Sequence, residues 1–251
     1  MKSPEVPFVV TRPAPDHRAL MARLGDAGID AIHSPAFEIE QVPEPLLRER
    51  IDGLKAYDLV IVTSPVAARL IARGASASDI RELGFFAPGR GTASVLEAVG
   101  LRCRFPESGG TSEDILAMPD FAGIEGVGIA IVGAPGGRGL LASELSRRGA
   151  RVEALHIYRR KPVAPAPALI TALRRSSGAV VLISSRQAFD MIGEALAEDL
   201  RPAWLGSRFV VSSERLERAC REAGVSRIRR ASGAADELML TAALEAGWMR
   251  G

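Results

Sequence analysis

The chain repeats one order of strand and helix twice, at an offset of about 121 residues. Residues 8–42 contain an apolar strand (FVVT), a break (RPAP), a helical segment ended by Gly28 and a long extended stretch. Residues 129–163 follow the same order with IAIVG, APGG, a helical segment ended by Gly149 and a second extended stretch. An internal repeat decides the whole fold, because each copy must build a similar unit.

The repeat continues through the rest of the chain. DLVIVTSPVAARLI, starting at Asp58, matches AVVLISSRQAFDMI, starting at Ala179. Residues 85–103 match residues 208–228, and the predicted helix start at TSEDILAMPD matches the one at AADELMLTAAL. The first pair shows a short β-branched run, a polar break and then helical periodicity, and the second reads as a strand, a polar break, a helix ended by Gly and a second short strand. Two copies of one four-unit alternation therefore fill the chain.

Strands that alternate with helices through short loops predict parallel sheets covered on both faces. The strand cores VIV, AVVLI and IAIV are continuous apolar runs, as a doubly covered sheet requires. We therefore predict two similar, doubly wound α/β domains, with a ligand cleft between them at the carboxyl ends of the strands. The extended stretches 31–45 and 152–167 could pair as a two-stranded connector. The repeat leaves open how its units are shared between the two domains.

Composition excludes several classes of protein. Hydrophobic residues make up 47% of the chain and the net charge is +2, without a basic stripe that would indicate a nucleic-acid partner. No apolar run approaches the ~18 residues of a membrane span, and the first residues lack the apolar core of a secretory signal, so we expect a cytoplasmic protein. Two cysteines without CxxC spacing and three scattered histidines predict neither a metal site nor a redox motif.

Small polar residues follow the predicted strands, just where helices begin. Backbone N–H groups and hydroxyls at such places bind anions, although for any single one of them plain helix capping by Ser and Thr is the favoured explanation. Taken together around one cleft, they predict an anion-binding site. The candidate binding residues are Thr11, Arg12, Thr63, Ser64, Gly91, Thr92, Gly136, Gly137, Arg138, Ser184, Ser185 and Ser213.

Two further segments allow alternative interpretations. GAPGGRG, residues 133–139, follows a strand and precedes a helix, but its spacing differs from the GxGxxG of dinucleotide-binding loops. A nucleotide-dependent transferase would use this loop. Tyr158 lies in the second extended stretch, and either packs as a half-buried strand aromatic or points into the cleft as a proton donor. The neighbouring Arg159, Arg160 and Lys161 are expected to form a solvated surface.

The order of these motifs is similar to that of the uroporphyrinogen-III synthase family. The resemblance rests on VTRP, TSPVAA, GRGTA, GAPGGRGLLASELSRRGARV, IYRRKP and SSRQAF, which span essentially the whole chain. Thr92 occupies the position of the Thr in the family's G-x-x-T-A loop, and Tyr158 that of its connector tyrosine. In the second copy Leu216 stands where that Thr would be, so no role is carried over to it.

The resemblance implies the missing domain assignment. Residues 1–35 and 166–251 would form a discontinuous domain, 52–152 an inserted domain, and 36–51 with 153–165 the connector. It also implies a lyase that cyclises hydroxymethylbilane to uroporphyrinogen III, with loss of water and inversion of ring D. Tyr158 would be the catalytic acid, without a metal or other cofactor.

The substrate class fits the anion-binding residues, because the linear tetrapyrrole carries eight carboxylates. We expect a monomer that receives its substrate by hand-over from hydroxymethylbilane synthase, with no nucleic acid and no membrane as partner. The alternative function is a non-catalytic two-domain ligand-binding or sensor protein.

Overall fold

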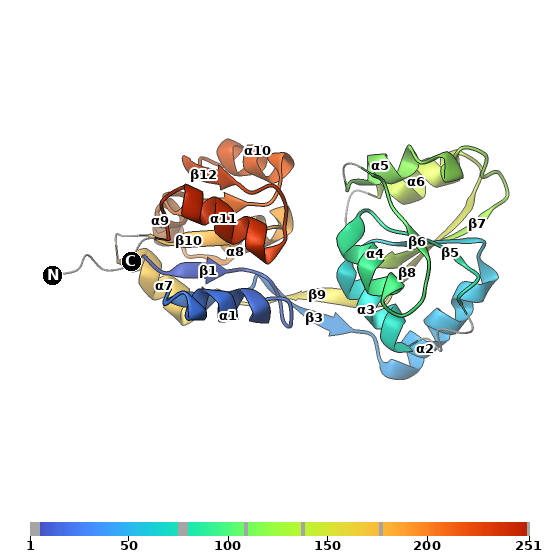
Figure 1. Cartoon of the computed structure of the whole chain (residues 1–251), viewed down its shortest axis with the longest axis horizontal. Coiled ribbons are helices and arrows are strands. Elements are labelled where there is room, and N and C mark those ends of the chain that lie inside the picture. Colours follow the sequence, from blue (N-terminus) through green and yellow to red (C-terminus); the bar gives the residue numbers. More distant parts are fainter. Residues whose placement is uncertain (1–5, 75–79, 108–109, 137–138, 176–177, 250–251) are drawn as a thin grey trace. The chain divides into compact units, whose positions relative to one another are not determined.

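The computed structural model describes residues 6–74, 80–107, 110–136, 139–175, 178–249 of the chain (Figure 1). They fall into two compact units. One unit contains the residues up to Ile39 together with those from Lys161 onward, and the other is Glu40–Arg160. Each unit is built on its own five-stranded sheet, in which every strand pair is parallel.

The first unit has the strand order β12-β11-β10-β1-β2. Its strands are β1 (Phe8–Val10), β2 (Ala31–His33), β10 (Val180–Ile183), β11 (Arg208–Val211) and β12 (Arg227–Arg230). Its helices are α1 (Arg18–Asp26), α7 (Pro167–Arg174), α8 (Arg186–Ala195), α9 (Arg201–Leu205), α10 (Glu214–Glu222) and α11 (Asp236–Glu245), with a 3-10 turn η3 (Glu198–Leu200).

The second unit has the strand order β6-β5-β4-β7-β8. Its strands are β4 (Leu59–Val62), β5 (Gly84–Phe86), β6 (Cys103–Arg104), β7 (Gly128–Gly133) and β8 (Arg151–His156). Its helices are α2 (Glu44–Asp52), α3 (Pro65–Gly74), α4 (Arg90–Glu97), α5 (Ser112–Leu116) and α6 (Leu140–Arg147), with 3-10 turns η1 (Gly53–Ala56) and η2 (Pro119–Phe121).

The two sheets are copies of each other down to the register of their strands. Phe8 pairs with Val180 in the first sheet, and Ile129 pairs with Leu59 in the second. These residues correspond at the repeat offset, and the same holds for the next strand on the outer side, β2 in one sheet and β8 in the other. The predicted fold of two similar, doubly wound parallel sheets is confirmed.

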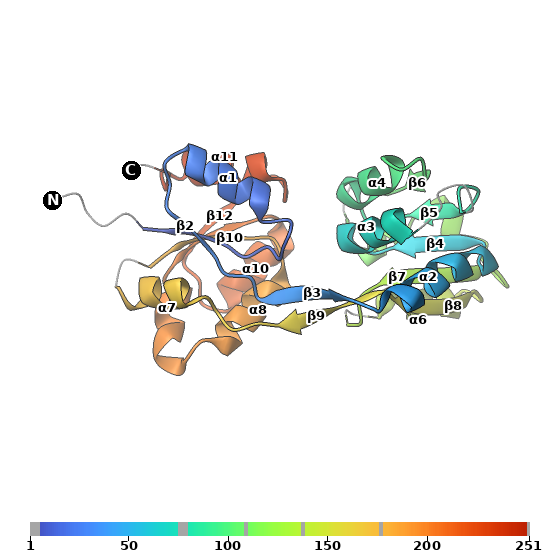
Figure 2. The same ribbon diagram turned by 90° about the horizontal axis from the view of Figure 1, so that it is seen from below.

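Both faces of the first sheet are covered, which explains its uninterrupted apolar strands. Phe8, Val10 and Leu182 face the layer of α1 and α11, and Val9 and Val181 face the opposite layer, which includes α7 and α8. Figure 2 shows these helices on the two sides of the sheet. Because side chains alternate along a strand, a one-residue slip would exchange the two cores, so the register is strongly specified.

The two stretches at which the chain passes from one unit to the other form a short two-stranded sheet of β3 (Phe37–Gln41) and β9 (Tyr158–Pro162). The Val42 N–H donates to the Ile157 carbonyl (3.2 Å), and the Val163 N–H donates to the Ala36 carbonyl (3.1 Å). From the first of these pairs to the second, the residue number falls in the first segment and rises in the second, so the strands are antiparallel. The predicted pairing of these two stretches is present.

The predicted connector was too long at two places. Residues 44–51 lie in helix α2, where Pro45 is tolerated because the first turn needs no N–H, and Leu47 and Ile51 bury one face. Residues 153–156 belong to β8, which pairs with β7 along its whole length. The predicted limits of the two domains otherwise stay a prediction.

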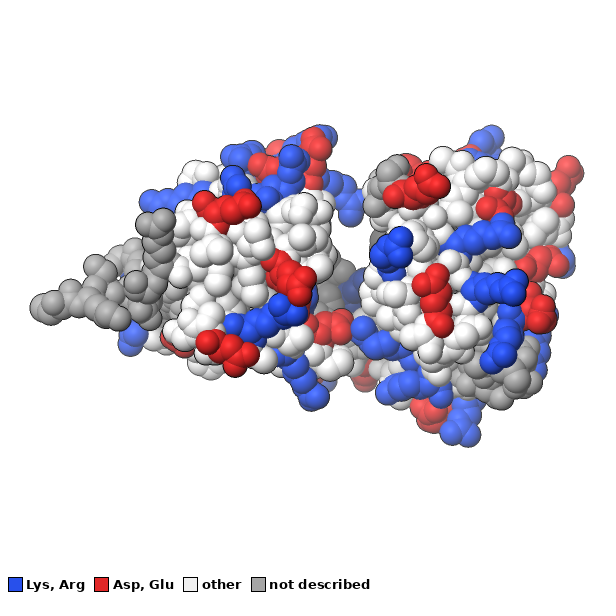
Figure 3. Space-filling view, in the orientation of Figure 1, with Lys and Arg blue, Asp and Glu red and all other residues white. Residues whose placement is uncertain are grey.

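Charge is mixed on the face of the molecule that Figure 3 shows. Lys and Arg side chains are interspersed with Asp and Glu over both units. A protein that tracks a nucleic-acid backbone instead presents a stripe of one sign. Among the described residues on this face, no such stripe is visible.

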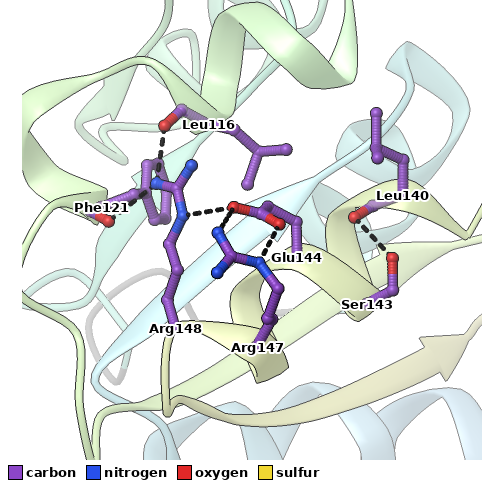
Figure 4. Close-up of polar contacts among 7 residues, drawn as sticks. All are labelled: Leu116, Phe121, Leu140, Ser143, Glu144, Arg147 and Arg148. Atoms are coloured by element: carbon purple, nitrogen blue, oxygen red, sulfur yellow. Dashed lines mark hydrogen bonds and ion pairs between the residues drawn. The ribbon is translucent and has the colours of Figure 1, made fainter.

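A polar cluster fastens helix α6 to the segment before β7 (Figure 4). The Arg148 Nη1 atom donates to the carbonyls of Leu116 (2.8 Å) and Phe121 (3.0 Å), the last residues of α5 and η2. Its Nε donates to Glu144 (2.9 Å), which also binds Arg147. These hydrogen bonds lower the pKa of Glu144 to about 2. Arg148 therefore donates hydrogen bonds to carbonyls at two helix ends, where the helix itself provides no N–H partner.

Replacing Arg148 should destabilise the second unit more than replacing its neighbour. We expect Arg148→Gln to lower the free energy of unfolding by about 1–3 kcal/mol, because two carbonyls lose a charged donor. Arg147→Gln is the matched control, since it also removes a partner of Glu144 but touches neither carbonyl; its effect should be clearly smaller. Urea unfolding followed by circular dichroism measures both. Equal losses would contradict the role assigned to Arg148.

Candidate functional site

The candidate binding residues follow the carboxyl ends of the inner strands in each unit. In the first unit they follow β1 (Thr11 and Arg12), β10 (Ser184 and Ser185) and β11 (Ser213). In the second they follow β4 (Thr63 and Ser64), β5 (Gly91 and Thr92) and β7 (Gly136). Parallel strands end at one edge, so each sheet gathers its own set there. Gly137 and Arg138 lie outside the described residues.

Three of the predicted serines cap the helix that follows them. The Oγ atoms of Ser64, Ser185 and Ser213 accept the N–H groups of the residues three positions later, at 3.2, 3.3 and 3.3 Å. These hydroxyls therefore satisfy helix N–H groups that would otherwise lack a partner. The capping interpretation holds for them, and any role in binding comes in addition.

Three threonine and serine hydroxyls bond to the backbone across neighbouring strands. Thr11 is buried and donates to the Leu182 carbonyl (3.0 Å), and Thr63 donates to the Val132 carbonyl (3.1 Å). The Ser212 hydroxyl donates to the carbonyl of Ser184 (3.4 Å). These contacts tie neighbouring strands together where the strands end. Thr92 is also buried, in the first turn of α4.

Arg12 is bound to the beginning of helix α11. Its guanidinium pairs with Asp236 and donates to the carbonyl of Ala234. The Arg12 carbonyl in turn contacts the Nε2 atom of His33 at 2.8 Å. The side chain is only 17% exposed, so it acts first as a clamp between β1 and α11.

Two histidines that look scattered in the sequence are stacked in the structure. The rings of His17 and His33 lie 3.7 Å apart at an interplanar angle of 9°. Burial and the neighbouring His33 lower the pKa of His17 below its ordinary value of 6.5. The sequence offered no signal for this pair, because His17 precedes α1 and His33 ends β2, and only the fold brings them together.

Tyr158 forms the most distinctive polar contact of the second unit. Its ring is buried, and its hydroxyl lies 3.0 Å from the Ser64 Oγ. Ser64 Oγ also accepts the Ala67 N–H at the beginning of α3. A phenol, an alcohol and the positive end of a helix thus form one chain, which can pass a proton and stabilise the oxygen that loses it.

A hollow of about 420 Å³ opens beside this chain, within the second unit. Its lining includes Thr63, Ser112, His156 and Arg160, together with three glycines and the first turn of α6. Among the described lining residues there is no Asp or Glu. The sequence analysis missed His156 and Arg160, because a basic run in an extended segment is typical of a solvated surface.

Neither metal ligands nor a membrane span is found in the part of the chain that the structure describes. Its His, Cys, Asp and Glu side chains form no group of three or more that could hold a metal ion. None of its helices is both long and apolar enough to cross a bilayer.

The fold and the polar residues at the strand ends define a class of protein. Its members have two doubly wound α/β units that carry hydroxyls, backbone amides and one buried tyrosine where their strands end. A sequence model of the family "Uroporphyrinogen-III synthase HemD" matches residues 18–241. The chain belongs to the uroporphyrinogen-III synthase family.

Individual relatives agree with this assignment. The uroporphyrinogen-III synthase of Escherichia coli is 30% identical over 245 residues, which cover 94% of this chain and 98% of that protein. The Salmonella typhimurium enzyme is 31% identical over 243 residues, with the same coverage of both chains. The resemblance, the predicted enzyme and its place in porphyrin biosynthesis are confirmed at the level of the family.

Solved structures support the fold. A mutant uroporphyrinogen III synthase from Thermus thermophilus superposes with a TM-score of 0.69 at 24% identity, covering 97% of this chain and all of that one. The Helicobacter pylori protein gives 0.61 at 14% identity, covering 96% and 99%.

The stacked histidines predict a dependence of stability on pH. Because the pKa of His17 is lowered on folding, the unfolded chain takes up a proton first as the pH falls. The stability from neutral His17 is complete above pH 6.5 and declines below it. We expect the melting temperature to fall more steeply from about pH 7 to pH 5 in the wild type than in His17→Gln. His156→Gln is the control, since the His156 side chain is exposed. If the melting temperature of His156→Gln depended on pH as little as that of His17→Gln, the assignment would be contradicted.

Proposed function

We propose that this chain closes hydroxymethylbilane to uroporphyrinogen III, with loss of the terminal hydroxyl as water and inversion of ring D. The observation that carries the proposal is the match of the family across residues 18–241. The candidate residues are consistent with it, because backbone amides, hydroxyls and arginines are what a carboxylate-rich tetrapyrrole requires. We place this reaction in the cytoplasm and propose a monomer that takes its substrate from hydroxymethylbilane synthase.

The leaving group needs only modest help. The pyrrole nitrogen donates its electron pair and expels the hydroxyl, which departs as water once it has gained a proton. We propose that Tyr158 and Ser64 supply this proton, since their hydroxyls lie within hydrogen-bond distance and the α3 N-terminus favours the resulting anion.

The harder task is positional. Ring D must attack through its substituted carbon, whereas uncatalysed closure uses the free carbon and gives isomer I. Holding the chain ends in the right geometry therefore decides the product, and catalysis of this kind needs oriented binding groups more than strong acids. We propose that hydroxyls and backbone amides at the strand ends contribute these groups.

The protein should form isomer III from freshly made hydroxymethylbilane without an added metal or nucleotide. The products are oxidised to porphyrins and the isomers separated by chromatography. A parallel incubation without protein gives the uncatalysed isomer I as the reference. Exclusive formation of isomer I, or activity lost on exhaustive chelation and restored by a metal, would overturn the proposal.

Tyr158→Phe tests the proposed acid. Loss of the phenol should lower kcat by roughly 10²-fold, the contribution of a general acid, while the ring continues to fill its buried site. Tyr57→Phe is the matched control, because Tyr57 is the other tyrosine of the chain and its hydroxyl bonds to Glu153 instead. Steady-state kinetics and a thermal melt are measured for both. If Tyr158→Phe turns over as fast as Tyr57→Phe, Tyr158 only packs.

A further inference from the structure

Two adjacent arginines of β9 have different surroundings. Arg159 is 68% exposed, and its Nε donates to Glu40 at 2.7 Å. Arg160 is half-buried and lines the hollow beside β7 and β8. Successive side chains of a strand point to opposite faces, so Arg160 shares a face with Tyr158 while Arg159 does not. The Arg160 guanidinium lies 5.9 Å from the centre of the Tyr158 ring, which fixes it near the proposed acid.

The lining of the hollow favours an anion. Arg160 supplies the positive charge and Thr63 and Ser112 supply hydroxyls, and none of the described lining residues is an Asp or Glu. A guanidinium in such surroundings is suited to a carboxylate, which it binds through two parallel hydrogen bonds.

Glycines keep this hollow open. A Cβ on Gly133 would lie 2.2 Å from the Thr63 Oγ1, so a side chain there would displace the threonine from its contact with β7. Gly136 and Gly139 have φ angles of +92° and +63°, which other residues rarely adopt. A Cβ at either of these two would meet nothing within 4 Å, so both border open space.

We propose that Arg160 binds one carboxylate of the tetrapyrrole in this hollow and thereby holds the reacting end of the substrate against Tyr158 and Ser64. The proposal deepens the proposed function and rests on it. It assigns the contact to Arg160 and excludes Arg159, although the two residues are neighbours in one basic run.

The test compares Arg160→Gln with Arg159→Gln in the full chain. Losing a charge-assisted contact should raise KM for hydroxymethylbilane roughly 10- to 100-fold in Arg160→Gln. The fraction of isomer I should rise as well, because a loosely held substrate closes without inversion. Arg159→Gln should stay within about twofold of the wild type, since an exposed ion pair contributes little. Arg160→Lys should recover part of the loss, because it keeps the charge but not the fork.

A binding measurement separates this proposal from the proposed function. Uroporphyrin III, a stable octacarboxylate, is titrated into each variant and followed by its fluorescence. Arg160→Gln should bind it roughly tenfold or more weakly than Arg159→Gln, with a smaller dependence on salt. This readout needs no turnover, and equal affinities would overturn the Arg160 assignment even if the wild type forms isomer III. A wild type that forms no isomer III would instead overturn the proposed function. Thermal melts identify a variant that fails to fold, and Arg160→Lys then carries the comparison.

Discussion

The candidate site depends on the parallel pairing of the central strands in each sheet. In the second unit β4 lies between β5 and β7, and all three end at the same edge. This pairing brings Thr63 and Gly133 into contact, although they are far apart in the sequence. The register is held by apolar side chains buried on both faces. The core therefore sets where the strands end, and the loops that follow have little influence on it.

Most hydroxyls at these edges serve the fold before they serve a ligand. Ser64, Ser185 and Ser213 cap helices, and Thr11 and Thr63 bond to neighbouring strands. Removing any of them changes stability together with binding, which makes single serine or threonine substitutions poor tests of function. Substitutions of Tyr158 and Arg160 are better probes, because they leave these capping and strand-bonding hydroxyls in place.

The two units share a scaffold but carry different chemistry. Tyr158 corresponds in the repeat to Phe37, a buried residue without a hydroxyl. The first unit places the stacked His17 and His33 and the Arg12–Asp236 pair at its edge. The second has the Tyr158–Ser64 contact and the hollow beside it. A duplicated fold therefore supports two unlike surfaces, because strand pairing constrains the apolar positions and leaves the edge residues free to differ.

The strands, most of the helices and the family follow from the amino-acid sequence. Continuous apolar runs and the repeat predict the strands, their succession along the chain in two matching units and the serines that begin helices, because these features depend on neighbours along the chain. Which side chains meet follows from the fold. It turned residues 44–51 into a helix, stacked His17 on His33 and carried Arg148 to the carbonyls of Leu116 and Phe121. It also decided which of Arg159 and Arg160 lines the hollow. Local alternation predicts only that the two side chains point to opposite faces, and the partner strand decides which face is which.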